Sequence, residues 1–278
     1  MNSYNLVGSL PGIFFQLKAL NSLQLDSNFL KGSIPLQFYE LPNIIAVSIK
    51  ANILIGGLST KIGNLTKLLS LELTFNHLAS TIPSEIGLLS NLVKLSLGKN
   101  GMRGVIPREI GNLTALKRLS LGDELTFNDA STNYLMNQLT GTIPTSVCKL
   151  VSLRLLNLGD NSLQGAIPTC LGILNELAFV NLQSNHFNSS IPDFSQNRNL
   201  TTLSLYRNKL TGTIPASLLQ LSGLVDLDLA DNKLNGNVPV GFLSAKLQRL
   251  SLSRNNLDGS ISRGLGNMSS LIIIDLGQ

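Results

Sequence analysis

The chain has 278 residues, and 21 Lys and Arg against 16 Asp and Glu give it a formal net charge of +5. Only 13% of the residues are charged, and the basic ones form neither a run nor a helix face, so we predict no nucleic-acid partner. No apolar stretch is long enough to cross a membrane, and the sequence starts without a visible secretory signal.

From residue 17 onward the sequence repeats itself every 23 or 24 residues, apart from one longer step. In the clearest copy, LVSLRLLNLGDNSLQGAIPTCLGI from Leu150 to Ile173, leucines occupy the first, fourth, seventh and ninth positions and an asparagine the twelfth. The asparagine recurs as Asn28, Asn52, Asn76, Asn100, Asn137, Asn161, Asn185, Asn208, Asn232 and Asn255. Self-similarity at this period indicates a leucine-rich repeat solenoid.

The repeats are predicted to form a single domain that spans residues 1–278. Residues 1–16 read as a partial repeat, 17–267 as ten full repeats, and 268–278 as a second partial repeat. We expect the capping segments and any secretion signal to be missing from this sequence. Without caps, the end layers around Leu6 and Ile273 would face water, which predicts fraying, aggregation or a partner.

Each repeat is predicted to form one strand and one return segment. The leucines of the L-x-L segment lie two residues apart, so they point to one side of an extended chain. The fold class is therefore an α/β repeat solenoid, a right-handed horseshoe or superhelix with a concave parallel β-sheet. The Ile-Pro segments are predicted to form short extended or helical turns on the back. Stacked asparagines can both donate and accept hydrogen bonds between coils.

Two local features interrupt the pattern. The fifth repeat carries thirteen extra residues, 124–136, which are either a passive loop insertion or a loop that touches a ligand. Cys148 and Cys170 lie in neighbouring repeats at positions that differ by two. We therefore predict free or half-buried thiols rather than a bridge.

The segment Leu89–Leu113, LSNLVKLSLGKNGMRGVIPREIGNL, closely follows the pattern LxxLxxLxLxxNxLxGxIPxxIGxL. It resembles the plant-type extracellular leucine-rich repeat. This resemblance implies an ectodomain of a plant receptor-like kinase or receptor-like protein, extracellular or at the cell surface, with a membrane segment outside this chain. Such domains bind peptides, small ligands or proteins on the concave or lateral face, and some pair with a co-receptor of the same repeat class. The alternative is a secreted inhibitor similar to polygalacturonase-inhibiting proteins.

Groups for catalysis or metal binding do not cluster in the sequence. His77 and His186 are four coils apart, and Asp226 with Asp228 forms a carboxylate pair on one predicted strand without a predicted cleft. We therefore predict no enzyme, no metal and no cofactor. Arg-x-Arg, a pair with which peptide receptors of the resembled family often receive a carboxylate, does not occur.

Five N-x-S/T sequons occur, and they are either part of the repeat consensus or acceptors of N-linked glycans in a secreted protein. We predict glycans at several of them: Asn64, Asn112, Asn188, Asn199 and Asn267.

Positions that flank the L-x-L leucines are predicted to point out of the concave sheet. They change from small and polar to basic, then apolar or aromatic, then acidic and basic along the chain, which is the composition of a recognition surface. The alternative is that these positions vary without function. The predicted ligand-binding residues are Lys94, Lys99, Arg118, Arg154, Leu155, Phe179, Tyr206, Arg207, Asp226, Asp228 and Arg249.

Overall fold

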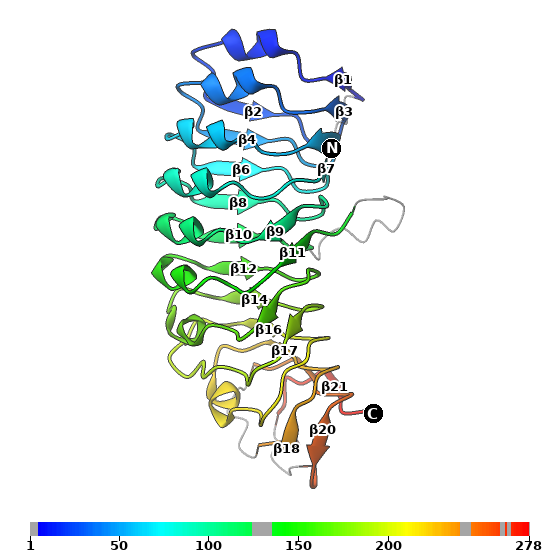
Figure 1. Cartoon of the computed structure of the whole chain (residues 1–278). Helices are drawn as coiled ribbons and strands as arrows, with labels where there is room; N and C mark the ends of the chain where they lie inside the picture. The colour runs from blue at the N-terminus through cyan, green and yellow to red at the C-terminus, as the bar shows by residue number, and fades with distance from the viewer. Residues whose placement is uncertain (1–4, 124–134, 240–245, 262–264, 266–267, 278) are drawn as a thin grey trace. The chain divides into compact units, whose positions relative to one another are not determined.

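The computed structural model describes residues 5–123, 135–239, 246–261, 265 and 268–277. It divides into two compact units, unit 1 (Met1–Thr140) and unit 2 (Gly141–Gln278). Figure 1 labels most of the strands of both units. The single continuous domain stays a prediction. Most of the insertion, residues 124–134, lies outside the described residues, as does the sequon asparagine Asn267.

The principal strands of unit 1 are parallel and follow one another in chain order, one per coil. Their central residues, such as Leu71 and Leu95, lie opposite each other, so the buried leucines stack in register. The strands are β2 (Ser22–Gln24), β4 (Ala46–Ser48), β6 (Ser70–Glu72), β8 (Lys94–Ser96) and β10 (Arg118–Ser120). A second set of strands pairs farther along the same coils: β1 (Val7–Ser9), β3 (Phe29–Gly32), β5 (Ile53–Gly56), β7 (His77–Leu78), β9 (Arg103–Val105) and β11 (Gln138–Thr140).

Unit 2 repeats this arrangement. Its principal strands pair in parallel in the order β12 (Leu155–Asn157), β14 (Phe179–Asn181), β16 (Thr202–Ser204), β17 (Asp226–Asp228), β19 (Arg249–Ser251) and β21 (Ile273–Asp275). Its second set of strands is β13 (Gln164–Gly165), β15 (His186–Phe187), β18 (Asn235–Asn237) and β20 (Asn256–Asp258). Both units therefore place one principal strand in each coil, as the L-x-L spacing predicts.

The helical turns that were predicted at the Ile-Pro segments are 3-10 helices of five residues. They are η1 (Gly12–Gln16), η2 (Leu36–Glu40), η3 (Thr60–Asn64), η4 (Ser84–Leu88), η5 (Arg108–Asn112), η6 (Thr145–Lys149), η7 (Thr169–Ile173) and η8 (Ala216–Gln220). Each follows a proline except η3, which follows Ser59. Proline presets φ near −65° and lacks an N–H, so it suits the residue before such a turn.

The repeated asparagines join the backbones of neighbouring coils. Asn52, for example, accepts a hydrogen bond from the N–H of Leu30 at 2.9 Å and donates to the carbonyl of Leu25 at 2.9 Å. Asn76 makes the equivalent bonds one coil later, and Asn185 does so in unit 2. These amides satisfy buried backbone groups where each coil leaves its principal strand.

Ser59 departs from the proline pattern, and a buried tyrosine compensates for the change. Unlike proline, Ser59 has an N–H, which donates to the hydroxyl oxygen of Tyr39 at 3.1 Å. Tyr39 is 1% exposed, and its ring packs edge-on against Phe38 with the ring centroids 5.1 Å apart. Burial raises the pKa of Tyr39, while the bond from Ser59 lowers it in part. The hydroxyl therefore provides the acceptor that this extra donor requires.

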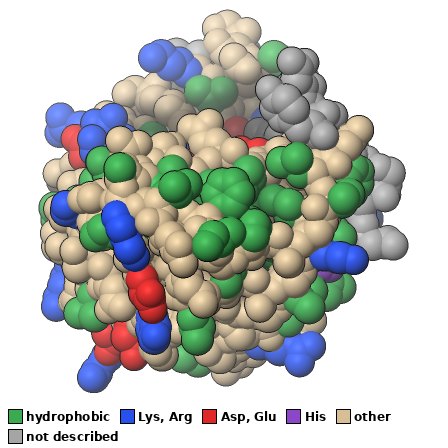
Figure 2. All heavy atoms as spheres, turned by 90° about the horizontal axis from the view of Figure 1, so that it is seen from above, with side chains coloured by type: hydrophobic (Ala, Val, Ile, Leu, Met, Phe, Trp, Pro, Cys, Tyr) green, Lys and Arg blue, Asp and Glu red, His purple; other side chains and the backbone are tan. Residues whose placement is uncertain are grey.

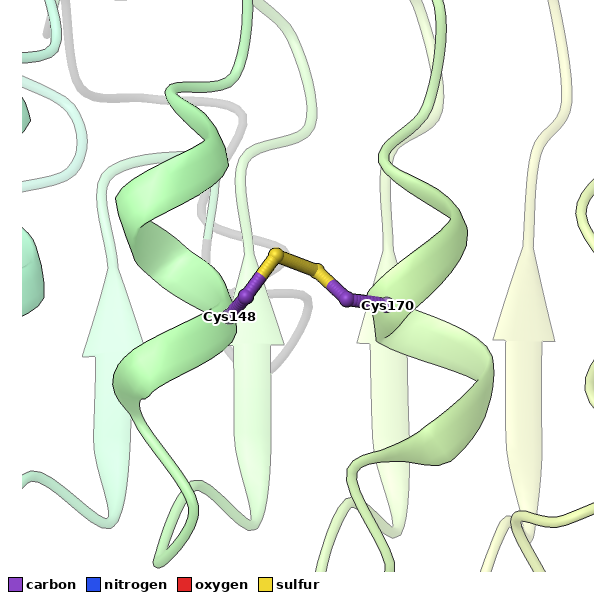
Figure 3. Close-up of a disulfide and its surroundings, with 2 residues drawn as sticks. All are labelled: Cys148 and Cys170. Carbon is purple, nitrogen blue, oxygen red and sulfur yellow. A yellow bond between two sulfur atoms is a disulfide. The ribbon is translucent and has the colours of Figure 1, made fainter.

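Cys148 and Cys170 form a disulfide, so the prediction of free thiols is wrong (Figure 3). The prediction assumed that equal repeat positions face each other, which holds for strands in register. In the 3-10 helices the fourth residue faces the second residue of the next helix. Gly87, fourth in η4, shows this offset, since a Cβ added to it would meet Glu109, the second residue of η5. Cys148 is fourth in η6 and Cys170 second in η7, and their Cα atoms are 5.5 Å apart.

The N-terminal end of unit 1 exposes part of its core, as the repeat pattern predicts. Figure 2 shows hydrophobic side chains gathered on this end. Val7, Ile13 and Phe14 are exposed, and a hollow of ≈ 290 Å³ is lined by Leu6, Val7, Leu10 and Phe14 among others. In unit 2 the three consecutive isoleucines 272–274 are also exposed. Aggregation or fraying at these ends stays a prediction.

Candidate ligand-binding face

In unit 2 the first residues of neighbouring principal strands form one row. The register pairs Leu155 with Phe179, Phe179 with Thr202, Thr202 with Asp226, and Asp226 with Arg249. Parallel strands are ~4.8 Å apart, so adjacent members of the row can touch. None of the five side chains is buried. The structure therefore brings four predicted site residues, Leu155, Phe179, Asp226 and Arg249, onto one face of the sheet.

A second row of small or acidic side chains runs beside the first, two residues later in each strand. Asn181, Ser204, Asp228 and Ser251 occupy it, and all four are buried although they lie on the same face of the sheet. Asp228 is the only one of these four that was predicted from the sequence as a site residue. The others could be found by counting two residues beyond the exposed position of each L-x-L segment.

Arg249 lies between the two predicted carboxylates. Its guanidinium is 2.7 Å from Oδ2 of Asp228 and 3.8 Å from Oδ2 of Asp226. Burial raises the pKa of both carboxyls; Arg249, and for Asp228 also the N–H of Ala230, lowers it only in part. Oδ1 of Asp226 is buried and has no hydrogen-bond partner in the described part of the chain. The cluster therefore contains two carboxyl groups and one guanidinium, and Oδ1 of Asp226 accepts no hydrogen bond from the described residues.

Tyr206 and Arg207 follow β16 and flank these rows. The guanidinium carbon of Arg207 lies 5.5 Å from the centre of the Tyr206 ring, and Nε is 3.6 Å from a carboxylate oxygen of Asp231. Arg207 has a positive φ of 53°, and in most other coils the residue that precedes the repeated asparagine also has a positive φ. Arg154 is exposed and pairs with Glu176 at 3.1 Å. These two predicted arginines are therefore already engaged by acidic neighbours.

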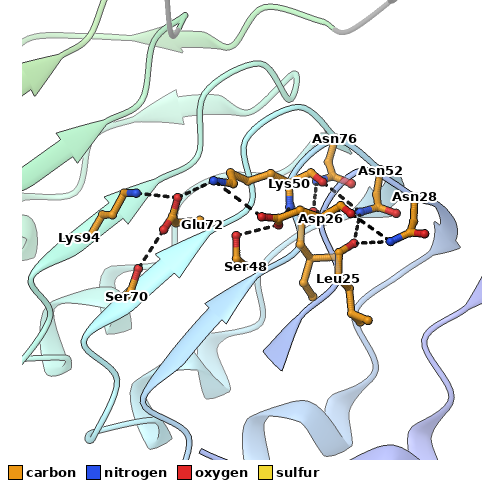
Figure 4. A network of polar contacts seen from close by, with 11 residues as sticks. Leu25, Asp26, Asn28, Ser48, Lys50, Asn52, Ser70, Glu72, Asn76 and Lys94 are labelled. Carbon is orange, nitrogen blue, oxygen red and sulfur yellow. Dashed lines mark hydrogen bonds and ion pairs between the residues drawn. The ribbon is translucent and has the colours of Figure 1, made fainter. Parts of the chain in front are cut away.

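The predicted lysines of unit 1, Lys94 and Lys99, are also paired with acids. Figure 4 shows the contacts of Lys94 and of its neighbour Lys50. Nζ of Lys94 is 2.7 Å and Nζ of Lys50 is 3.0 Å from the same oxygen of Glu72, and Lys50 also approaches Asp26 at 3.7 Å. Burial alone would raise the pKa of Glu72, but the hydrogen bonds and charges of Lys94 and Lys50 outweigh it and lower the pKa. Lys99 pairs with the carboxylate of the residue before the insertion, Asp123, at 3.0 Å.

The basic stretch that was predicted from the sequence is thus much less basic than its residues suggest. Among the described residues, Arg118 and its neighbour Lys117 are exposed and make no ion pair. Glu72 was not predicted as the partner of Lys94 because the two residues are 22 apart in the sequence. A search for opposite charges one coil apart would have found this pair.

The predicted glycan acceptors lie outside these rows. Asn64, Asn112, Asn188 and Asn199 are exposed. Within the described residues, no group of three or more His, Cys, Asp or Glu side chains is placed to hold a metal ion. In the same part of the chain, no helix has the length and apolar character needed to span a membrane.

The stacked coils, the parallel principal strands and the asparagine bonds between coils define a leucine-rich repeat protein. The family model described as Leucine Rich Repeat matches residues 152–174, 199–221 and 246–268. The chain is also 30% identical to the LRR protein LIC12759 of Leptospira interrogans, with a TM-score of 0.57 and coverage of 98% of this chain and 77% of that one. The chain belongs to the leucine-rich repeat family.

Structural neighbours within this family include plant receptor ectodomains. The ectodomain of the Arabidopsis receptor kinase HAESA, in complex with an IDA peptide hormone, is 32% identical with a TM-score of 0.87, over 98% of this chain and 44% of that one. The plant peptide hormone receptor RGFR1, in complex with RGF2, is 29% identical with a TM-score of 0.83, over 97% and 45%. This chain therefore spans less than half the length of either receptor chain. A comparison with curated proteins gives no match.

Proposed function

We propose that this chain is an extracellular ligand-recognition domain of a plant leucine-rich repeat receptor, and that it is not an enzyme. The observation that carries the proposal is the row from Leu155 to Arg249, which exposes an apolar, an aromatic and two charged side chains in register on one sheet face. The similarity to HAESA and RGFR1, both solved with peptide hormones, favours a peptide as the ligand.

The chemistry of the two rows suits an extended peptide that runs across the strands. Phe179 and Tyr206 offer partly exposed rings, which are frequent anchors in protein interfaces. Asp226 is partly exposed and offers a carboxylate that can accept a hydrogen bond from a donor on the ligand. Because Arg249 and Arg207 already have acidic partners, they orient these acids and add little free charge.

The extracellular location is supported by two features. The disulfide between Cys148 and Cys170 is of a kind that persists in oxidising compartments and is rare in the cytosol. Exposed sequons suit a protein that passes through the secretory pathway. A leucine-rich repeat co-receptor is a further proposed partner, because HAESA has also been solved with the co-receptor SERK1.

The test uses peptides selected from a displayed library of random sequences against the wild-type chain. Phe179→Ala and Tyr206→Ala should each weaken the selected peptides about tenfold, which corresponds to ~1.4 kcal/mol. Ile173→Ala is the matched control, because Ile173 is an exposed apolar residue of η7 in the same unit. Thermal unfolding would show that all three variants are folded. The proposal fails if both ring variants bind normally while Ile173→Ala weakens binding.

A further inference from the structure

A second set of asparagine side chains joins neighbouring coils, separate from the repeated asparagines described above. Nδ2 of Asn43 donates to the carbonyl of Lys18 at 2.9 Å, and Nδ2 of Asn91 donates to the carbonyl of Thr66 at 2.9 Å. Nδ2 of Asn199 makes the equivalent bond in unit 2, to the carbonyl of Asn175 at 2.7 Å. All three asparagines occupy the third position of their repeat. We call these residues the outer asparagines.

Asn199 is the member of this set that also begins a sequon, Asn199-Leu200-Thr201. Asn43 and Asn91 make the same bond but are followed by Ile-Ile and Leu-Val, so the bond does not depend on the sequon. The hydroxyl of Thr201 is occupied as well, because Oγ1 donates to the carbonyl of Ala178 at 2.9 Å. Both polar groups of this sequon therefore bind the preceding coil.

The sequons at Asn64, Asn112 and Asn188 differ from the one at Asn199. Asn64 and Asn112 are the last residues of η3 and η5, and Asn188 directly follows β15. All three are exposed, and in the described part of the chain their side-chain amides make no hydrogen bond. A substituent on any of these amide nitrogens would displace no contact of the fold.

We propose that the described sequons are of two kinds: Asn64, Asn112 and Asn188 carry N-linked glycans, whereas Asn199 is a structural residue without one. A glycan on Nδ2 of Asn199 would replace one N–H of a nitrogen that lies 2.7 Å from the carbonyl of Asn175. The sugar would have to pass beside the neighbouring coil, and the bond between coils would be disturbed. The inference rests on the proposed extracellular location.

The experiment expresses the full chain behind a plant secretion signal and measures glycan occupancy at each site by peptide mass spectrometry. Asn64, Asn112 and Asn188 should be mostly occupied and Asn199 mostly unoccupied. Thr201→Val removes one sequon and should leave the mass of the attached glycans unchanged. Thr66→Val, its matched control at the Asn64 sequon, should remove the mass of one glycan.

Stability gives a second measurement that does not depend on glycans. Asn199→Ala and Asn91→Ala should lower the thermal midpoint by similar amounts, about 1–3 °C, because each loses one bond between coils. Occupancy at Asn199 equal to that at Asn64 would overturn the inference, as would an unchanged midpoint for Asn199→Ala beside a lowered one for Asn91→Ala. Absence of glycans from all sites would instead contradict the extracellular location.

Discussion

Replacing Tyr39 by Phe isolates the contact that compensates for the missing proline at position 59. The change removes the oxygen that accepts the N–H of Ser59 at 3.1 Å and leaves the rest of the buried ring in place. A backbone donor left without a partner in this partly buried site costs about 1–2 kcal/mol. We expect Tyr39→Phe to lower the free energy of unfolding by this amount, measured by urea unfolding monitored by circular dichroism.

The second variant, Ser59→Pro, removes the donor and makes the prediction specific. Ser59 has φ of −74° and ψ of 150°, values that proline can adopt without strain. In the Ser59→Pro background, Tyr39→Phe should cost less than about 0.5 kcal/mol, because no N–H is left unpaired. If Tyr39→Phe costs the same in both backgrounds, the hydroxyl acts through packing alone and this reasoning is refuted.

Three further perturbations test other contacts by urea unfolding. Replacing both Cys148 and Cys170 by Ala should cost about 3 kcal/mol, because their disulfide closes a loop of 22 residues; an unchanged midpoint would contradict this. Asn197→Leu should stabilise the chain by about 2 kcal/mol, since Asn197 is fully buried with both polar atoms of its amide unpaired, and a loss of stability would show that the amide has a role. Asp226→Asn should raise stability at pH 7 and leave it nearly unchanged at pH 3. The folded state binds the proton of Asp226 more tightly than the unfolded state does. The stability that this proton binding contributes is therefore fully present below the ordinary pKa of an aspartate and is lost as pH rises through the raised pKa. A larger effect of Asp226→Asn at pH 3 than at pH 7 would contradict this.

The repeat architecture could be predicted because period and chemistry agree in every coil. Leucines two residues apart indicate a strand with one buried side, and an asparagine at a fixed interval indicates a bonded turn. The register followed from the same spacing, so the row that contains Phe179 and Asp226 could be predicted without coordinates. Proline before every described 3-10 helix except η3 predicted where the chain bends, but the 3-10 geometry depends on hydrogen bonds that the sequence does not display.

The contacts between coils were harder to predict because they depend on how helices and long side chains approach each other. Cys148 and Cys170 meet across a difference of two repeat positions, an offset that exists in the helices but not in the strands. Lys94 and Lys99 read as free cations in the sequence, yet each has an acidic partner in the fold. Periodicity predicts which face a residue occupies; charge compensation also depends on side-chain reach across coils.

Hydrogen exchange with and without a peptide selected against the wild-type chain tests the proposed recognition face most directly. Slower exchange on binding should concentrate in β14, β16 and β17, the strands that carry Phe179 and Asp226 and precede Tyr206. Exchange in η6, η7 and η8 of the same unit should remain unchanged. Protection confined to these 3-10 helices, with exchange in the three strands unaltered, would contradict the account.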